Sequence, residues 1–164
     1  MSLAFLSPSS TATDLLTSPL ERTLDGVDPE VVRDLSLQGK IELRGSLDVV
    51  EPAEGEELIR LSPCRGYLLV EDDPVEVVER IRGDGVRAYD ATATLGGLAF
   101  EGERVARRLT DLDLDRLPAA GMFAKIGALL VRDEGERFRV YVPQELGHYV
   151  AECVLDALAG LDNT

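Results

Sequence analysis

The sequence predicts an α+β fold in which helices pack on one face of a mainly antiparallel sheet. Short apolar runs with strand-like patterns recur along the chain, and turns rich in Gly, Pro and charged residues join them. Short amphipathic helices separate these hairpin-like pairs, as is typical of antiparallel α+β proteins. A ferredoxin-like arrangement is the closest simple template for this order of elements.

The first part of the chain predicts an arm, a helix and a strand. Residues 1–18 are rich in Ser, Thr and Pro, which favours a flexible arm, and residues 19–164 are long enough for a single domain. Asp28 followed by Pro29 predicts the start of a short helix. Residues 40–44 then alternate polar and apolar side chains, which is the pattern of a half-buried strand ending at Gly45.

The middle of the chain alternates between predicted strands and helices. Asp73 and Pro74 provide a cap and a first helical position, and Gly83 is placed to end that helix. An acidic loop is expected before it, at residues 48–57. The further elements expected here are strands at residues 58–61, 67–70, 86–91 and 98–100 and a helix at residues 103–109.

The last part predicts a loop, a hairpin and a long helix. Residues 110–120 are acidic and contain a proline, which indicates a loop. Two apolar runs at residues 126–131 and 138–142 flank a charged turn with a glycine, and so predict a β-hairpin. Residues 144–159 carry apolar side chains at successive spacings of three and four, which is the pattern of an amphipathic helix.

Composition excludes several classes of partner. Seventeen Lys and Arg residues against thirty-one Asp and Glu give a net charge of −14, which repels nucleic acid and anionic membranes. This acidity fits a solubilising surface or a partner with a basic face. Cys64 and Cys153 are far apart and form no recognisable motif, and no apolar run approaches the ~20 residues that span a bilayer. We therefore expect a soluble cytoplasmic protein.

Three motifs resemble functional sites, and local features of the sequence argue against each of them. The run from Gly83 to Ala88 matches a dinucleotide-binding pattern, but a helix precedes it and a strand follows, which is the reverse of the required order. Alternating aspartates at residues 111–115 lack the glycine and glutamate of a calcium loop. His148, the one histidine, lies on the polar side of the last helix, which indicates an exposed surface residue, with a role at an interface or in proton transfer as the alternative. The sequence therefore predicts no catalytic residue and no metal site.

One group of residues remains as a candidate ligand site. Asp90, Thr92 and Thr94 come after the strand residues Val86 to Tyr89, and polar groups at a strand end commonly line a cleft. With Tyr89 they form the candidate ligand site. Capping of a turn is the alternative for Asp90 and the two threonines. For the four tyrosines of the chain, burial of the ring in a core is the ordinary explanation, and stacking on a ligand is the alternative.

The order of several segments carries a family resemblance. It runs through residues 18–22, 41–45, 61–70, 89–92, 98–102 and 110–114 to the final hairpin and helix. In this order the chain resembles the gamma subunit of heterotetrameric sarcosine oxidase, a relative of the folate-binding domain of the glycine cleavage T-protein. Residues 46–57 are shorter than the helix-bearing stretch of that family. Residues 126–131 lack the carboxylate that the T-protein relatives use, which argues against aminomethyl transfer.

The resemblance implies an accessory subunit without activity of its own. Such a subunit docks to a larger flavoprotein in methylated-amine and one-carbon metabolism, and the flavin and nicotinamide sites lie on other chains of a sarcosine-oxidase-like oxidoreductase complex. Self-association is the other mode of assembly. The alternative is a stand-alone folate-binding or aminomethyltransferase-like protein, in which Tyr89, Asp90 and Thr92 would line a tetrahydrofolate site. A scaffolding domain without any ligand is a third class.

Overall fold

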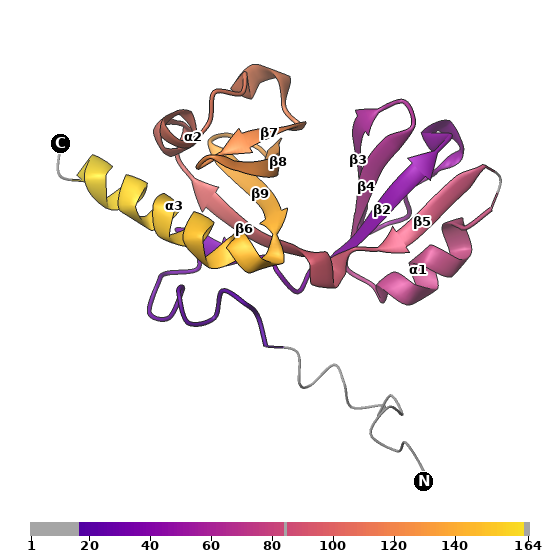
Figure 1. Ribbon diagram of the computed structural model, residues 1–164, viewed down its shortest axis with the longest axis horizontal. Helices are drawn as coiled ribbons and strands as arrows, with labels where there is room; N and C mark the ends of the chain where they lie inside the picture. Colours follow the sequence, from indigo (N-terminus) through magenta and orange to yellow (C-terminus); the bar gives the residue numbers. More distant parts are fainter. Residues whose placement is uncertain (1–16, 84, 163–164) are drawn as a thin grey trace, which may run out of the picture.

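Two antiparallel sheets and three α-helices form the computed structural model, which describes residues 17–83 and 85–162 (Figure 1). One sheet has five strands in the order β1-β6-β9-β8-β7, and the other has four in the order β3-β4-β2-β5. The α+β class is therefore confirmed. The strands that were expected in one sheet are divided between two.

The four-stranded sheet carries one helix on one of its faces. Its elements are β2 (Gly39–Gly45), β3 (Glu56–Ser62), β4 (Arg65–Val70), α1 (Pro74–Ile81) and β5 (Val86–Asp90). Asp73 accepts a hydrogen bond of 2.9 Å from the Val75 amide, so the predicted cap begins the helix. Val77 and Val78 of α1 then pack against Ile41 and Leu43 of β2.

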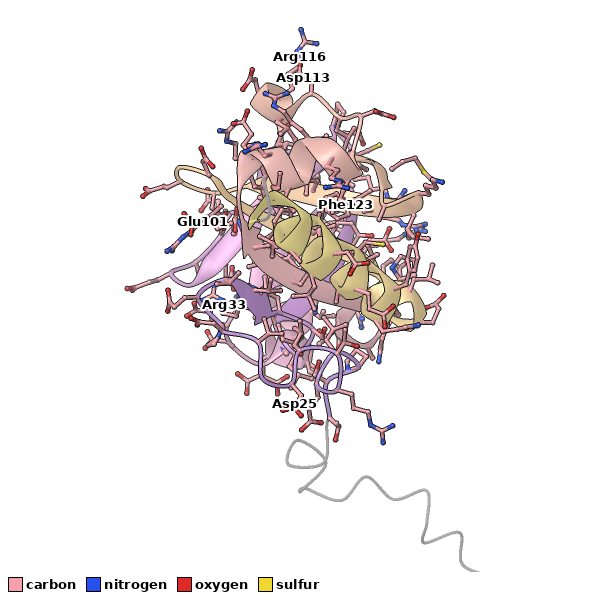
Figure 2. The ribbon with its side chains drawn as sticks, turned by 90° about the vertical axis from the view of Figure 1, so that its left-hand side faces the viewer. Asp25, Arg33, Glu101, Asp113, Arg116 and Phe123 are labelled. Atoms are coloured by element: carbon pink, nitrogen blue, oxygen red, sulfur yellow. The ribbon has the colours of Figure 1, made fainter. Side chains whose placement is uncertain are left out.

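The five-stranded sheet carries two helices on one face. Its elements are β1 (Val32–Asp34), β6 (Leu95–Glu101), α2 (Glu103–Leu109), β7 (Ala119–Phe123), β8 (Ile126–Arg132), β9 (Arg137–Pro143) and α3 (Gly147–Asp162). Figure 2 looks onto this helical layer, where α3 crosses in front of the sheet and Phe123, which is 0% exposed, lies among the buried side chains. Asp113 and Arg116 project from one end of the molecule in the same view.

The faces that carry no helix turn towards each other. Ile59 and Leu69 of the four-stranded sheet pack with Leu129, Val131 and Tyr141 of the five-stranded sheet in one apolar cluster. The layers therefore run helix, sheet, sheet, helix. Figure 1 shows the two sheets meeting near the link between β5 and β6 and diverging towards β7 and β3.

The expectation of a helix that begins at Asp28 is wrong. The amides of Val31 and Val32 donate to the Asp28 carbonyl at 2.9 and 3.0 Å, which closes a single turn, and β1 follows. Val32 lies opposite Phe100 in the antiparallel pair with β6 and is buried. The capping signal was real, but pairing with a neighbouring strand satisfies the backbone better than one further helical turn.

Several other boundaries differ from those expected, among them the start of β3 at Glu56, within the loop expected at residues 48–57, and the start of β6 at Leu95 instead of residue 98. The loop at residues 110–120 ends where β7 begins, because Ala119 pairs with Leu130 across the hairpin to β8. The last helix starts as a 3₁₀ turn at Gln144–Leu146 and continues through Gly160 to Asp162. Of the arm expected at residues 1–18, only Thr17 and Ser18 are described. The Ser18 hydroxyl donates to the Asp34 carboxylate.

Candidate functional site

The four residues of the predicted ligand site lie where the chain crosses from one sheet to the other. Asp90 accepts a hydrogen bond of 2.8 Å from the Thr92 amide, and the Thr94 hydroxyl donates to the Ala91 carbonyl at 2.8 Å. The Thr92 hydroxyl accepts from the Lys40 amide at 3.1 Å. These bonds hold the 3₁₀ turn Thr92–Thr94, as the capping alternative expects. A role for the four residues in ligand binding stays a prediction.

A buried cation lies beside this crossing. Lys40 is 0% exposed, and its ammonium donates to the carbonyls of Ser36 and Gln38 at 2.8 and 2.7 Å. Burial lowers the pKa of Lys40 to about 8, although the charges of Asp34 and Asp90 act in the opposite direction. Asp90 therefore stabilises the charged ammonium as well as capping the turn.

The tyrosines are buried to different degrees. Tyr141 is buried, donates to Gln38 Oε1 at 2.8 Å, and has its pKa raised to about 12, chiefly by burial. Tyr67 is half-buried, but Tyr89 and Tyr149 are 47% and 39% exposed. The expectation of ring burial is thus wrong for Tyr89 and Tyr149. These rings lie at a sheet edge and a helix surface where no other layer covers them.

A cleft of about 480 Å³ opens between the two sheets, within the size range of ligand sites. Arg65 and Tyr67 line it from the four-stranded sheet, and Met122, Leu129 and Tyr141 line it from the five-stranded sheet. Most of its lining is apolar, and its base is the cluster in which the sheets meet. This cleft could not be predicted from the sequence, because strands that are far apart in the chain form its walls.

Three arginines lie abreast on the wall of the four-stranded sheet. Arg44 of β2 lies directly opposite Arg65 of β4 and opposite Arg87 of β5. Directly opposed residues of antiparallel strands point to the same face, and here that face is turned away from α1. We call these three residues the arginine row.

One carboxylate partly neutralises the arginine row. Glu42 Oε1 accepts from Arg44 at 2.9 Å and from Arg65 at 3.1 Å. Slight burial lowers the pKa of Arg65, and the neighbouring Glu42 and Tyr67 outweigh that effect and raise it. Arg87 is exposed and makes no ion pair with the described residues. The arginine row thus holds three positive charges beside one negative charge.

A fourth arginine joins the two sheets. Arg139 of β9 contacts Glu57 of β3 at 2.7 Å and Asp133 at 2.6 Å, and its side chain is only 10% exposed. Burial alone would lower the pKa of Arg139, but hydrogen bonds to the two carboxylates raise it. Since Glu57 and Arg139 belong to different sheets, this ion-pair network ties the sheets together.

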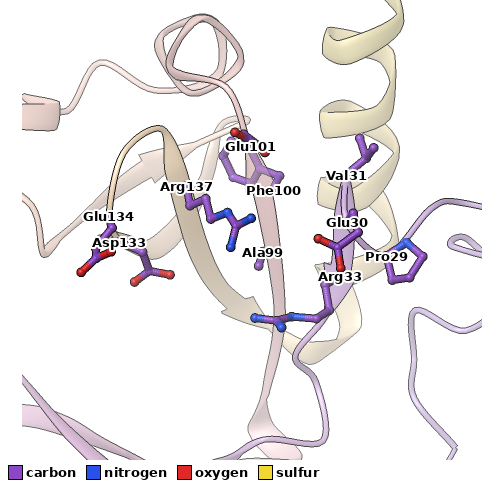
Figure 3. Close-up of a pocket in the computed structure, with 10 residues that line it drawn as sticks. All are labelled: Pro29, Glu30, Val31, Arg33, Ala99, Phe100, Glu101, Asp133, Glu134 and Arg137. Carbon is purple, nitrogen blue, oxygen red and sulfur yellow. The ribbon is translucent and has the colours of Figure 1, made fainter.

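A second hollow, of about 330 Å³, lies at the far end of the five-stranded sheet. Figure 3 shows Arg33 and Arg137 reaching into it from β1 and β9, with Glu30 and Glu101 nearby. Cations and carboxylates are mixed here, so the hollow presents no single charge to a ligand. Within residues 17–83 and 85–162 no group of three His, Cys, Asp or Glu side chains is arranged to hold a metal ion.

Other sequence motifs lie apart from the cleft. His148 is exposed on α3, and Asp113 accepts from the Asp115 amide at 3.2 Å in a 3₁₀ turn. The run from Gly83 links the end of α1 to β5, as the turn interpretation expects. In the part of the chain that the structure describes, no helix combines the length and apolar character needed to cross a bilayer.

Comparison with known proteins identifies a solved structure with the same fold. No family model and no curated protein matches the sequence. Among solved structures, a chain of the heterotetrameric sarcosine oxidase from Corynebacterium sp. U-96, in complex with pyrrole 2-carboxylate, matches with a TM-score of 0.70 and 17% identity. The match covers 89% of this chain and 96% of that chain. The two chains share one fold.

This likeness of fold agrees with the resemblance drawn from the order of sequence segments. A weaker match, to the aspartate kinase of Clostridium acetobutylicum, has a TM-score of 0.42 and 10% identity, and it covers 77% of this chain and 33% of that chain. The sarcosine oxidase match includes both sheets, since its coverage leaves too few residues unmatched to omit either one.

Proposed function

We propose that this protein is a non-catalytic accessory subunit, which assembles in the cytoplasm with a larger flavoprotein of methylated-amine and one-carbon metabolism. One observation carries the proposal. The fold extends over 96% of a chain that belongs to a heterotetrameric oxidase, so the likeness is to a whole subunit of that assembly. The two cysteines, Cys64 and Cys153, are unpaired, which supports the cytoplasm as the compartment.

The construction of the protein supports a role in assembly. The most buried of the described charged side chains are engaged in structural bonds, such as Arg139 with its two carboxylates and Lys40 with two backbone carbonyls. The open cleft and the arginine row, in contrast, offer surface that this chain does not fill. A larger subunit would contribute the flavin and the reacting groups.

Purification of the affinity-tagged full chain from its own host tests the proposal. We expect a larger polypeptide to co-purify in fixed stoichiometry, to show the visible absorption of bound flavin, and to oxidise an N-methylated amino acid with consumption of oxygen. Cells that express the unattached tag provide the control. A tagged chain that is purified as a stable monomer without a flavin-bearing partner would contradict the proposal.

A stand-alone folate-binding protein is the second candidate, and the cleft favours it. The half-buried Tyr67 could stack on an aromatic ring, and Arg65 at the same cleft could bind a carboxylate of tetrahydrofolate. Titration calorimetry of the purified chain with tetrahydrofolate tests this. Heat that disappears in Arg65→Gln would support it, and the absence of heat at millimolar ligand would remove it.

A further inference from the structure

The arginine row is an arrangement that a sheet does not favour by itself. Directly opposed residues of antiparallel strands have Cβ atoms about 4.5–5.5 Å apart, and like charges in such positions are destabilising. Arg44 meets a like charge on both sides, in Arg65 and Arg87. Glu42 offsets the repulsion for two of the three, through the bonds to Arg44 and Arg65. An external anion would offset the rest.

The charge of the row is opposite to that of the whole protein. The chain has a net charge of −14, and yet three guanidinium groups gather on one sheet face with a single carboxylate between them. A local positive region on an acidic protein attracts an acidic group to that region, while the remaining surface repels it. This contrast orients an acidic partner towards the arginine row.

The row is accessible, and it lies beside the cleft. The side chains of Arg44 and Arg65 are 57% and 52% exposed, and Arg65 also lines the cleft. On the other wall Met122 is 55% exposed, and Gly127 has no side chain to fill the space. An occupant therefore meets positive charge on one side and an apolar side chain on the other.

The width of the row indicates the size of the occupant. Neighbouring strands lie about 4.8 Å apart, so a row across three strands extends over roughly 10 Å. A single carboxylate or phosphate could engage these guanidinium groups, but it would leave the apolar wall of the adjoining cleft uncovered. An occupant that covers both the arginine row and that wall carries carboxylates and an apolar side chain along its length, as an acidic polypeptide segment does.

From the geometry, the charge and the exposure together, we infer that the arginine row and the adjoining cleft are the docking surface for an acidic segment of the larger partner subunit. This inference rests on the proposed accessory role and names the surface that performs it. The carboxylates of the segment pair with Arg44, Arg65 and Arg87, and an apolar side chain of the segment packs against Met122.

Substitution of the whole row tests the inference in the complex with the flavoprotein partner. The variant R44Q/R65Q/R87Q keeps the length of polar side chains and removes three charges. The control R22Q/R82Q/R104Q removes three exposed arginines on other surfaces, so both variants have the same net charge. Binding of each purified variant to the isolated partner is measured over a range of salt concentrations, together with thermal unfolding of the free chains.

We expect the row variant to bind roughly 10–100-fold more weakly, with a flatter salt dependence, and the control to bind within about two-fold of the wild type. Unfolding of the free row variant at the wild-type temperature or above would show that folding is intact. Equal affinity of row variant and wild type would overturn the inference and leave the accessory role standing. Self-association of the wild type through the row would also overturn it. If no flavoprotein partner is recovered at all, it is the proposed function that fails.

Discussion

Arg139 and the arginine row lie on the facing surfaces of the two sheets, and they are neutralised to different degrees. Arg139, on the five-stranded sheet, is 10% exposed and contacts two carboxylates, Glu57 and Asp133. The arginine row, on the four-stranded sheet, is half exposed and contacts one carboxylate, Glu42. Arg139 stabilises the contact between the sheets, and the arginine row leaves positive charge facing the cleft.

The difference in exposure and pairing indicates a structural role for Arg139 and a binding role for the arginine row. A buried charge is tolerated only when its partners are already present in the folded protein. An exposed charge can remain partly unpaired, because water solvates it until a partner displaces that water. We therefore expect substitutions of Arg139 to affect stability, and substitutions of the arginine row to affect association.

The largest effect is expected for Arg139→Met. This change leaves Glu57 and Asp133 without their shared cation, and should lower the free energy of unfolding by about 2–4 kcal/mol. Urea denaturation of the purified variant measures it. Arg137→Met is a matched control, since Arg137 is an exposed residue of the same strand and sheet face, and should change stability by less than about 0.5 kcal/mol. Equal losses in the two variants would contradict the structural role of Arg139.

Lys40 extends the comparison to a buried cation whose hydrogen-bond partners in the described chain are carbonyl oxygens. Burial lowers its pKa from 10.5 to about 8 in the folded protein, so the unfolded chain binds more protons between these pH values. Stability should therefore rise by about 1–2 kcal/mol as the pH increases from 8 towards 10. Urea denaturation at a series of pH values measures this rise, and Lys40→Met should lack it. A rise of the same size in that variant would assign the effect to other groups.

Local sequence patterns predicted much of the fold. The helix at Glu103–Leu109 was predicted with its observed bounds, and the cap at Asp73 begins α1 as expected. Prediction was wrong at β1, where pairing with β6 replaces the helix that Asp28 would begin. It missed β7, whose Ala, Gly and Met residues have little strand propensity by themselves. Both errors concern strands that form only because a distant neighbour pairs with them.

The candidate site was harder to predict, because it depends on register and on contacts between sheets. The position of the predicted ligand site at a strand end is confirmed. Tyr89 and Asp90 end β5, and Thr92 and Thr94 lie in the turn that follows it. The spacing of Arg44, Arg65 and Arg87 along the sequence does not show that they lie side by side on adjacent strands. That alignment requires the strand order β4-β2-β5 and its register, which bring together residues from three separate stretches of the chain.

A smaller effect is expected for Glu42→Gln. Removal of the one carboxylate in contact with the arginine row leaves the repulsion between Arg44 and Arg65 uncompensated, and should destabilise the protein by about 1 kcal/mol. The loss should shrink at high salt, where the repulsion is screened. Glu79→Gln, on the exposed side of α1, is the control and should be near neutral. A loss that does not depend on salt would indicate that Glu42 acts through packing instead of charge.

The smallest effect, and the one of opposite sign, is expected for Arg87→Gln. Arg87 contributes repulsion towards Arg44 and has no carboxylate partner among the described residues, so its removal should raise the free energy of unfolding by about 0.2–0.5 kcal/mol at low salt. Arg65→Gln is the matched comparison, because it removes an equal repulsion together with the attraction to Glu42, and the two changes oppose each other. Chemical denaturation at low and high salt separates the variants. A stabilising effect of Arg87→Gln that disappears at high salt shows that the free protein holds this charge at a cost to its own stability, which is the property that a surface reserved for an acidic partner should have. Destabilisation by Arg87→Gln would show instead that the folded chain already satisfies the whole arginine row.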